Sequence, residues 1–443
     1  MPRLNKRGVT FRPLVRLSVR RQLELFTRSQ SFGMLFLAAF GSGLGTWLAF
    51  VALTVDVFDR THSGPWVSAL LIADFLPTIA IGLLFGPLLD RLSRRGLMVA
   101  ADLVRFGVFC ALPFATSATQ IVALAGVAGF ATGFFRPAVY AGLPNLVSDA
   151  DLPRANSLLQ TIENVTTTAG PLVGGILVSV SSPHAAYWIN AATFVVSAVL
   201  ILRIPGRLLQ VRAAPSEGHL RDLSAGFALV RRSRPLLTVL VAWNVAMIAN
   251  AGVNVSEVVL AKISFHAGDF GFGLLVATAG FGLAAGSLAA GPLLERRRTR
   301  EVYGGSLALM AVGAGLAAIS PNVWVAAICV VVSGAGNGAT VVCNALLVQR
   351  GAPDALRGRA FTVLMSSTAV TLGAGMIAAG IVTNALGARW VWGIAAGILA
   401  VAAALGLVLA RGVEVGGAAA EVRPLPVVPE IETASIEGGR GTL

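Results

Sequence analysis

Three charged side chains lie inside long apolar segments of the chain, where ionisable groups are the best candidates for chemistry. Arg136 and Glu163 fall in two successive segments, and Asp74 falls in an earlier one. A charge inside hydrocarbon is costly, so an ionisable residue there is a functional candidate by default. Arg136 lies nine residues before the end of its segment, and Glu163 lies about seven residues after the start of the next one, so both are at a similar depth from the same side of the membrane. In antiparallel helices we therefore expect the two side chains to form an ion pair.

Both the expected pair and Asp74 have two interpretations. The Arg136–Glu163 pair could take part in proton coupling, or it could be static and merely neutralise two buried charges. A lone carboxylate in a medium of low dielectric favours its protonated form, so Asp74 could load a proton from outside. Asp74 could equally be a water-exposed residue in a cleft.

Other charged residues near the ends of apolar segments favour structural roles. Asp102 and Arg105 are three residues apart, which predicts a local ion pair on one helix. Asp56 and Asp59 stand at the far end of the first segment, where we expect them to be solvated.

Composition decides which elements must position these residues. The 443 residues are 56% hydrophobic and only 12% charged, against about 25% charged residues in a soluble domain. One or two water-soluble cores could not bury so much apolar surface, which excludes a soluble enzyme. The cysteines and histidines show no metal-ligand spacing, and no phosphate-binding loop is present. We therefore expect no catalytic residue, no metal and no cofactor.

The uncharged runs predict an all-α multi-pass membrane protein embedded in the lipid bilayer. A helix crosses the hydrocarbon with about 20 apolar residues, and lipid offers no partner to an open backbone. The twelve predicted transmembrane helices are 31–54, 66–89, 97–116, 120–145, 156–180, 185–203, 236–260, 270–294, 302–320, 323–347, 360–384 and 389–410.

The distribution of positive charge predicts the orientation. Of the 34 Lys and Arg residues, only Arg60, Lys262 and Arg389 fall in the loops of one face. The positive-inside rule therefore places both termini in the cytoplasm, in a cell membrane or bacterial inner membrane. The same rule accounts for the net charge of +13, so we expect no nucleic-acid partner.

The chain repeats itself in two halves. GPLLDRLSRR at 86–95 has a counterpart in GPLLERRRTR at 291–300, and AGPLVGGIL at 169–177 has one in AGMIAAGIV at 374–382. Six spans in each half predict two six-helix bundles with a substrate site at their interface. The predicted domains are a cytoplasmic N-terminal segment 1–30, a bundle 31–203, a cytoplasmic linker 204–235, a bundle 236–410 and a disordered cytoplasmic tail 411–443.

This arrangement, together with a Gly-x-x-x-Asp-Arg-x-x-Arg-Arg loop, resembles the major facilitator superfamily (MFS) over about residues 30–410. The matching residues are Gly86, Asp90, Arg91, Arg94 and Arg95, with Gly291 and Glu295 in a degenerate second copy. A carboxylate such as Asp90 at a helix C-terminus is disfavoured by the helix dipole and needs cationic partners. The resemblance implies a gating latch on the cytoplasmic side. Alternatively, these arginines only follow the positive-inside rule.

A second motif is similar to the fifth-helix signature of the drug–proton antiporters of the superfamily. It comprises Gly170, Pro171, Gly174 and Gly175. Two glycines four apart let a neighbouring helix approach closely, and the proline bends the helix. The resemblance implies an interface that controls leak and direction, although plain helix packing would explain the same residues. The segment 134–147 is similar to the branch that contains macrolide and siderophore exporters.

The resemblance also implies which spans line a substrate cavity, namely the first, fourth, seventh and tenth. The residues they offer are Phe40, Trp47, Tyr140, Asn250, Asn254, Glu257, Asn337 and Asn344. Such a mixed aromatic and amide lining would suit a large amphiphile. Each Asn could instead make an interhelical hydrogen bond, worth about 0.6 kcal/mol on average. Antiporters of the superfamily place an Arg of the fourth span near a proton-carrying carboxylate, which implies a proton-coupling role for Arg136 and Glu163. Asp74 is a second candidate for proton coupling, on the ground of its own position inside an apolar segment.

The sequence thus predicts a secondary active transporter that works by alternating access. We expect proton-coupled efflux of an amphiphilic small molecule of the drug, macrolide or siderophore type, a link to drug resistance, and a monomer. The alternatives are an importer of the same fold, a lipid flippase and a non-transporting membrane receptor or scaffold.

Overall fold

The computed structural model describes residues 29–84, 93–148, 151–209, 227, 229–352 and 357–411, and within these the chain is helical with no strand. The first six long helices are α2 (Gln30–Thr61), α3 (Gly64–Leu84), α5 (Arg94–Ala111), α6 (Ala118–Gly142), α7 (Leu152–Val180) and α8 (Pro183–Leu202). The remaining ones are α10 (Arg234–Thr238), α11 (Asn244–Val259), α12 (Gly268–Arg296), α13 (Thr299–Ile319), α14 (Val323–Gly351), α15 (Arg357–Leu386) and α16 (Ala388–Leu409).

Short polar residues begin several of these helices. The Ser29 hydroxyl accepts a hydrogen bond from the backbone N–H of Phe32 and caps α2. Ser117 and Gln120 form a reciprocal capping box at the start of α6. Such caps satisfy N–H groups that the first turn of a helix leaves without partners. The helix boundaries therefore follow from local sequence at these positions.

The seventh span contains two wider turns. Residues Val239–Trp243 (η4) and Leu260–Ser264 (η5) are π-helical and join α10, α11 and the loop to α12 into one continuous span. π-helical turns inside α-helices occur frequently at functional sites. Here they flank the part of α11 that carries the predicted cavity residues.

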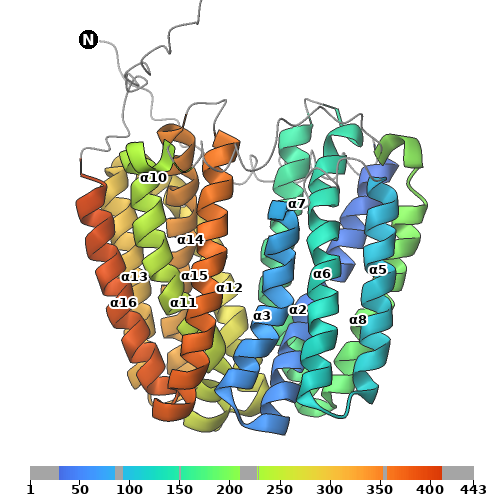
Figure 1. The fold of residues 1–443 in the computed structure, drawn as a ribbon, viewed down its shortest axis with the longest axis horizontal. Coiled ribbons are helices and arrows are strands. Elements are labelled where there is room, and N and C mark those ends of the chain that lie inside the picture. The colour runs from blue at the N-terminus through green and yellow to red at the C-terminus, as the bar shows by residue number, and fades with distance from the viewer. Residues whose placement is uncertain are drawn as a thin grey trace, which may run out of the picture.

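The helices form two bundles that stand side by side (Figure 1). One bundle contains α2 to α8 and the other contains α10 to α16. Helix α2 begins at the same end of the bundles at which α16 ends, the upper end in this view. Ten of the described helical segments are long and apolar enough to cross a membrane. The all-helical, multi-pass architecture is therefore confirmed, while the count of twelve spans and the cytoplasmic termini stay predictions.

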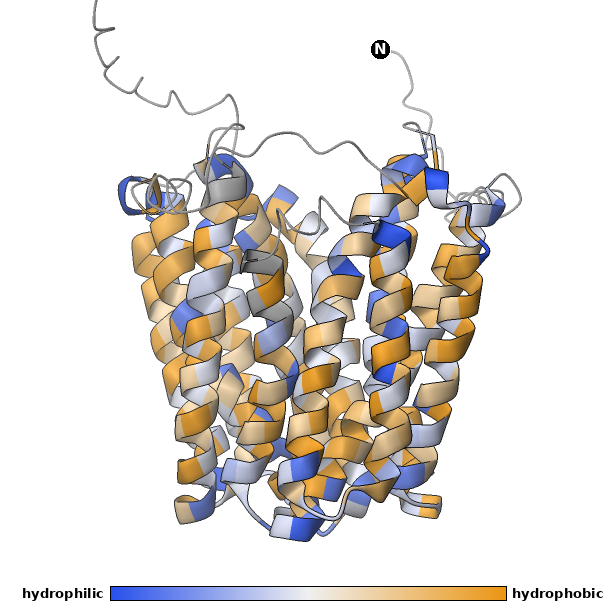
Figure 2. Ribbon diagram, turned by 45° about the vertical axis from the view of Figure 1, so that its right-hand side comes forward, coloured by the Kyte–Doolittle hydropathy of each residue, from blue (hydrophilic) through white to orange (hydrophobic). Residues whose placement is uncertain are grey.

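Hydrophobic residues predominate along the helices of both bundles (Figure 2), and many large apolar side chains are exposed. Large exposed side chains include Leu288, Val370 and Ile319. Trp188, Trp324 and Trp390 are exposed within the first two turns of α8, α14 and α16. Exposed apolar surface of this extent fits a lipid environment rather than water, and tryptophans gather at the level of the lipid headgroups.

Among the described residues, the buried core is continuous between the bundles at one end. One buried cluster runs from α2, α3 and α8 through α11, α12 and α16. A separate cluster occupies the end of the first bundle where α2 begins, and it includes Phe32, Met98, Leu159 and Ile201. The bundles are thus packed together at the end remote from the termini, which we call the closed face.

Direct contacts between the bundles lie at this closed face. The backbone N–H of Gly64 donates to Asn384 Oδ1 at 2.8 Å, and the Ser68 hydroxyl donates to the carbonyl of Met376 at 2.7 Å. Both bonds join α3 to α15. These two bonds therefore hold the α3 side of the first bundle against the second bundle.

The predicted domain boundaries fall partly outside the described residues. The N-terminal segment 1–30 is described only from residue 29, and the tail 411–443 only at Arg411. Much of the linker 204–235 is also outside. These three assignments stay predictions.

Candidate functional site

A cavity of about 280 Å³ lies between the two bundles. Helices α2, α3 and α7 line it on one side, and α11, α12, α13, α14 and α16 line it on the other. The predicted cavity residues that line it are Trp47, Asn250, Asn254, Glu257 and Asn337. The spacing of the three residues on α11 does place them on a common face, and that face is turned to the interface.

A second cavity of about 220 Å³ opens within the first bundle, between α2, α6 and α7. It shares Trp47 and Thr167 with the first cavity, so the two are adjacent. Tyr140 lines it, as do Arg136 and Glu163. Phe40 and Asn344 line neither of these two cavities.

Arg136 and Glu163 form the expected contact across α6 and α7. Arg136 Nη2 lies 2.8 Å from Glu163 Oε2. The hydroxyl of Tyr140, one turn beyond Arg136, donates to Glu163 Oε1 at 2.8 Å. The Arg136 side chain is 62% exposed and that of Glu163 is 30% exposed. Both charges can therefore be reached from the cavity, which the sequence alone did not indicate.

Asp74 does not line either of these two cavities. Its residue is half-buried on α3, and its backbone carbonyl packs tightly against Gly129 of α6. The glycine is needed there, because any larger residue would collide with that carbonyl. The proton-carrying role of Asp74 stays a prediction.

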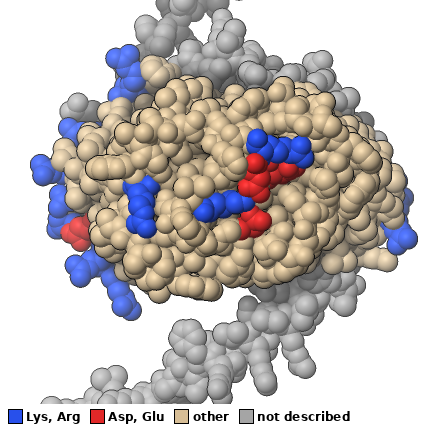
Figure 3. Space-filling view, turned by 90° about the horizontal axis from the view of Figure 1, so that it is seen from below, with Lys and Arg blue, Asp and Glu red and all other residues tan. Residues whose placement is uncertain are grey.

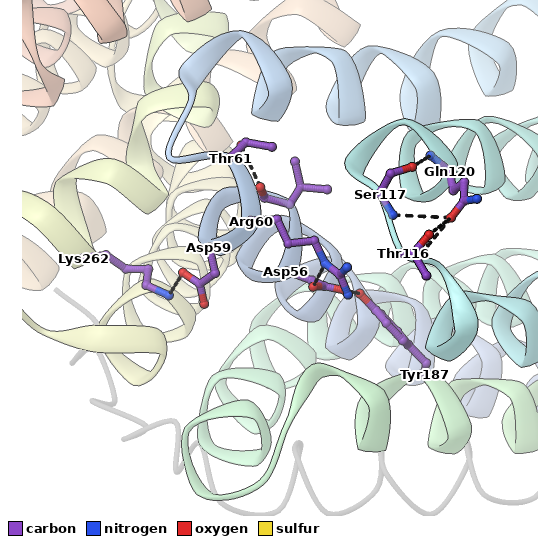
Figure 4. Close-up of polar contacts among 10 residues, drawn as sticks. Asp56, Asp59, Arg60, Thr61, Thr116, Ser117, Gln120, Tyr187 and Lys262 are labelled. Atoms are coloured by element: carbon purple, nitrogen blue, oxygen red, sulfur yellow. Dashed lines mark hydrogen bonds and ion pairs between the residues drawn. The ribbon is translucent and has the colours of Figure 1, made fainter.

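Charged residues gather near the centre of the closed face (Figure 3). Lys262 in η5 forms ion pairs with Asp59 of α2 and, at 2.6 Å, with Asp269 of α12. Figure 4 shows the Lys262–Asp59 contact. The Lys262 side chain is 16% exposed, so the pair is partly shielded from solvent. Lys262 thus bridges the first bundle and the second.

Asp56 was expected to be solvated, and that prediction is wrong. Asp56 is 7% exposed and accepts hydrogen bonds from Arg60 Nε at 2.6 Å and from the Tyr187 hydroxyl at 2.9 Å (Figure 4). Helix α8 covers this end of α2 and removes Asp56 from solvent. This contact could not be predicted from local sequence, because Tyr187 is 131 residues away along the chain.

Asp102 and Arg105 form the local pair that their spacing predicts, at 2.5 Å. Both are buried. The Ser197 hydroxyl of α8 donates to the other carboxylate oxygen at 2.7 Å, and the Arg105 guanidinium stacks 4.4 Å from the ring centroids of Phe135 and Phe194. The pair therefore fastens α5 to α6 and α8, which is a structural role.

The gating motif is described only in part. Gly86, Asp90 and Arg91 lie outside the described residues. Arg94 Nη1 donates to the carbonyl of Ala141 at 2.6 Å, and Arg95 donates to the carbonyl of Leu202. These carbonyls belong to the last turns of α6 and α8, where cations are favourable.

The second copy of the gating motif looks different. Gly291 and Glu295 are exposed near the end of α12, and Glu295 makes no ion pair with the described part of the chain. The latch role of both copies stays a prediction.

The glycines of the antiporter motif make close contacts on two sides of α7. A Cβ on Gly170 would lie 2.5 Å from the Cβ of Trp47, and one on Gly174 would lie 2.6 Å from the carbonyl oxygen of Leu48. The close approach to a neighbouring helix that their spacing predicts is therefore to α2. Pro171 lies inside α7 between them.

Gly175 faces the other bundle. A Cβ on this residue would lie 2.9 Å from the Cα of Gly273 in α12. The motif thus joins an approach within the first bundle to an approach between the bundles. The sequence did not separate these two functions, because it does not say which helix stands opposite each glycine.

The ion pair between Asp59 and Lys262 at the closed face was also not predicted from the sequence. Asp59 and Lys262 stand at the predicted outer ends of the first and seventh spans. These spans hold equivalent places in the two halves, which was the available signal. Among the described residues, no group of three or more His, Cys, Asp or Glu could hold a metal ion.

Two bundles around a shared cavity, sealed at one face, define a transporter of the major facilitator class. A family model described as "Transmembrane secretion effector" matches residues 26–432. The chain therefore belongs to that family, and it is an MFS transporter and a multi-pass membrane protein rather than an enzyme.

Relatives and a solved structure agree with this assignment. The chain is 21% identical over 368 residues to macrolide efflux protein A of Streptococcus pyogenes, covering 80% of this chain and 89% of the relative. It is 26% identical over 343 residues to the enterobactin exporter EntS of Citrobacter koseri, covering 76% and 81%. A bacterial homologue of the human lysosomal transporter Spinster, solved in an inward-facing and unoccupied conformation, superimposes with a TM-score of 0.70 at 13% identity over 88% of this chain and 98% of that one. The last comparison supports the fold alone.

Proposed function

We propose that this MFS transporter is a proton-coupled exporter of an amphiphilic small molecule. The observation that carries the proposal is the cavity between the bundles, which adjoins an Arg136–Glu163 pair and is sealed on the Lys262 side. Alternating access needs a central pocket that one face closes at a time, and this arrangement provides it.

The pair offers a way to couple the cavity to protons. Glu163 accepts hydrogen bonds from both Arg136 and Tyr140. A proton on Glu163 would cancel the charge that holds the Arg136 guanidinium, and it would convert one acceptor oxygen into a donor. The net charge of the cavity wall would rise by one, which would favour release of a cationic amphiphile.

Two considerations support export as the direction. With both termini in the cytoplasm, as the positive-inside rule predicts, the closed face is the outer face. The cavity would then load from the cytoplasmic side. The relatives named as a macrolide efflux protein and an enterobactin exporter support the same direction.

The test uses inside-out vesicles from cells that express the chain. With the lumen made acidic, we expect the vesicles to accumulate a substrate from a panel of erythromycin, enterobactin and ethidium, and to lose it when nigericin collapses the pH gradient. Glu163→Gln should abolish the response to the gradient. Glu301→Gln is the matched control, because Glu301 is exposed in the first turn of α13.

The direction and the coupling can fail separately. Accumulation only in right-side-out vesicles with an acidic exterior would show an importer. Accumulation that persists after the gradient collapses would show that protons do not drive transport.

A further inference from the structure

Glu257 differs from the other buried carboxylates that have been described above. It is 6% exposed on α11, and its Oε1 has no hydrogen-bond partner among the described residues. Asp102 and Asp56, by contrast, each have an arginine and a hydroxyl group as partners. The fold thus supplies partners to the carboxylates that hold helices together, and it supplies none to Glu257 Oε1.

The surroundings of Glu257 identify the cavity as the place where its partner belongs. Glu257 lines the cavity between the bundles, and it is the one charged side chain among the described residues that do so. No cation of the described chain therefore neutralises it inside the cavity. A buried charge without a partner is costly, so a ligand that brings a positive charge would be favoured there.

Apart from the neutral polar side chains of Thr167, Ser333 and three asparagines, the remaining wall is apolar and aromatic. Trp47, Phe50, Phe75 and Trp392 line the cavity together with Val and Leu side chains. Aromatic faces attract organic cations, and do so more strongly when both partners are desolvated. The wall therefore favours a cation that carries a large apolar body over a small hydrated one.

Trp392 provides a second buried polar atom that lacks a hydrogen-bond partner among the described residues. It is 1% exposed, and its Nε1–H has no acceptor among the described residues. Buried indole N–H groups normally have one. A ligand with an ether, carbonyl or hydroxyl oxygen would supply the acceptor that Trp392 lacks.

We propose that this cavity selects lipophilic organic cations, with the Glu257 carboxylate as the counter-ion of the ligand and Trp392 as a hydrogen-bond donor to it. The inference rests on the proposed function in one respect, that the cavity is the substrate site. It goes further by naming the substrate class as monocationic amphiphiles. Anionic amphiphiles are excluded from the class, because the same carboxylate repels them.

The test measures equilibrium binding to the full chain, purified in detergent and without a pH gradient. The probes are tetraphenylphosphonium and tetraphenylborate, which have almost the same size and shape and opposite charge. We expect the wild-type protein to bind the cation at least about tenfold more tightly than the anion. Glu257→Gln should weaken cation binding by about tenfold and remove the preference between the two ions.

Further variants separate charge from packing. Glu257→Asp should retain part of the preference, whereas Glu301→Gln, on an exposed position of α13, should leave it unchanged. Trp392→Phe should weaken binding of verapamil, a protonated amine with ether oxygens, more than binding of tetraphenylphosphonium, which has no acceptor. Size-exclusion profiles and thermal melts check that each variant is folded.

The outcomes are distinguishable from those of the transport test. Equal binding of the two ions by the wild-type protein, or unchanged cation preference in Glu257→Gln, would overturn the inference even if the vesicles transport. A Glu257-dependent cation preference would uphold it even if no gradient drives transport, in which case the proposed function alone would fail.

Discussion

Lys262 and Asp59 form an ion pair that ties the second bundle to the first at the closed face. Lys262 also contacts Asp269, 2.6 Å away, within its own bundle. One ammonium thus serves two carboxylates, only one of which must separate from it when the bundles move apart. The contact is suited to a latch that opens and closes, because Lys262 keeps a partner in both states.

Removing this ion pair should favour opening of the closed face. Lys262→Met should change the ratio of closed to open molecules by about fivefold, since partly exposed ion pairs are worth up to about 1 kcal/mol. Spin labels at Ser181 and Pro321, which lie on different bundles at this face, would report it. Distances between the two labels, measured by pulsed electron–electron double resonance, should show a new population at longer distance.

Arg389→Met is the matched control for the latch. Arg389 is a cation of the same face, and it donates to the carbonyls of Ala318 and Ser320 within the second bundle. Its removal should leave the distance distribution unchanged. An identical shift in both variants would mean that Lys262 acts on local packing and not as a link between bundles.

The Arg136–Glu163 pair should respond to exchange of its charges. Arg136→Glu alone places two carboxylates together and should lower the apparent Tm. Combining it with Glu163→Arg should restore part of the loss, because the ion pair is rebuilt in reverse. Fluorescence-detected size exclusion after heating measures this. A double variant as unstable as the sum of the single variants would argue against a functional contact between the two side chains.

Tyr187 should contribute to stability through its hydroxyl. Tyr187→Phe removes the hydrogen bond to the buried Asp56 carboxylate, which should cost about 1–3 kcal/mol, and lower the apparent Tm measured in detergent. Tyr303→Phe is the control, because the Tyr303 hydroxyl is buried and has no partner among the described residues. A loss of the same size in both would show that deleting a buried hydroxyl is costly in itself and that the bond to Asp56 adds nothing.

Gly175 should be what allows the two bundles to approach closely. Gly175→Ala places a methyl group 2.9 Å from the Cα of Gly273, a contact that only backbone movement can relieve. We expect the conformation with a sealed closed face to become less populated and transport to slow. Gly397→Ala, where no heavy atom lies within 4 Å, should leave both unchanged, and the spin-label distances would again provide the measurement.

The sequence predicted the class of fold because membrane helices are encoded locally. Each span needs only its own run of apolar residues, and the halves repeat GPLLDRLSRR and GPLLERRRTR. The same local logic predicted the Asp102–Arg105 pair, whose members share one helix turn. The Arg136–Glu163 contact was also accessible, since successive helices are antiparallel and equal depths along them coincide.

For other side chains, only the tertiary structure decided which of them have partners and which do not. Asp56 was expected to be solvated, but α8 covers it and brings Tyr187 to it. Lys262 meets Asp59 only because the seventh span packs against the first. The sequence analysis treated Glu257 as one of several cavity residues. The packing of the surrounding helices leaves its Oε1 without a hydrogen-bond partner among the described residues. Period and composition fix where a helix lies along the chain, whereas contacts between distant helices depend on how their surfaces fit together, which no short stretch of sequence contains.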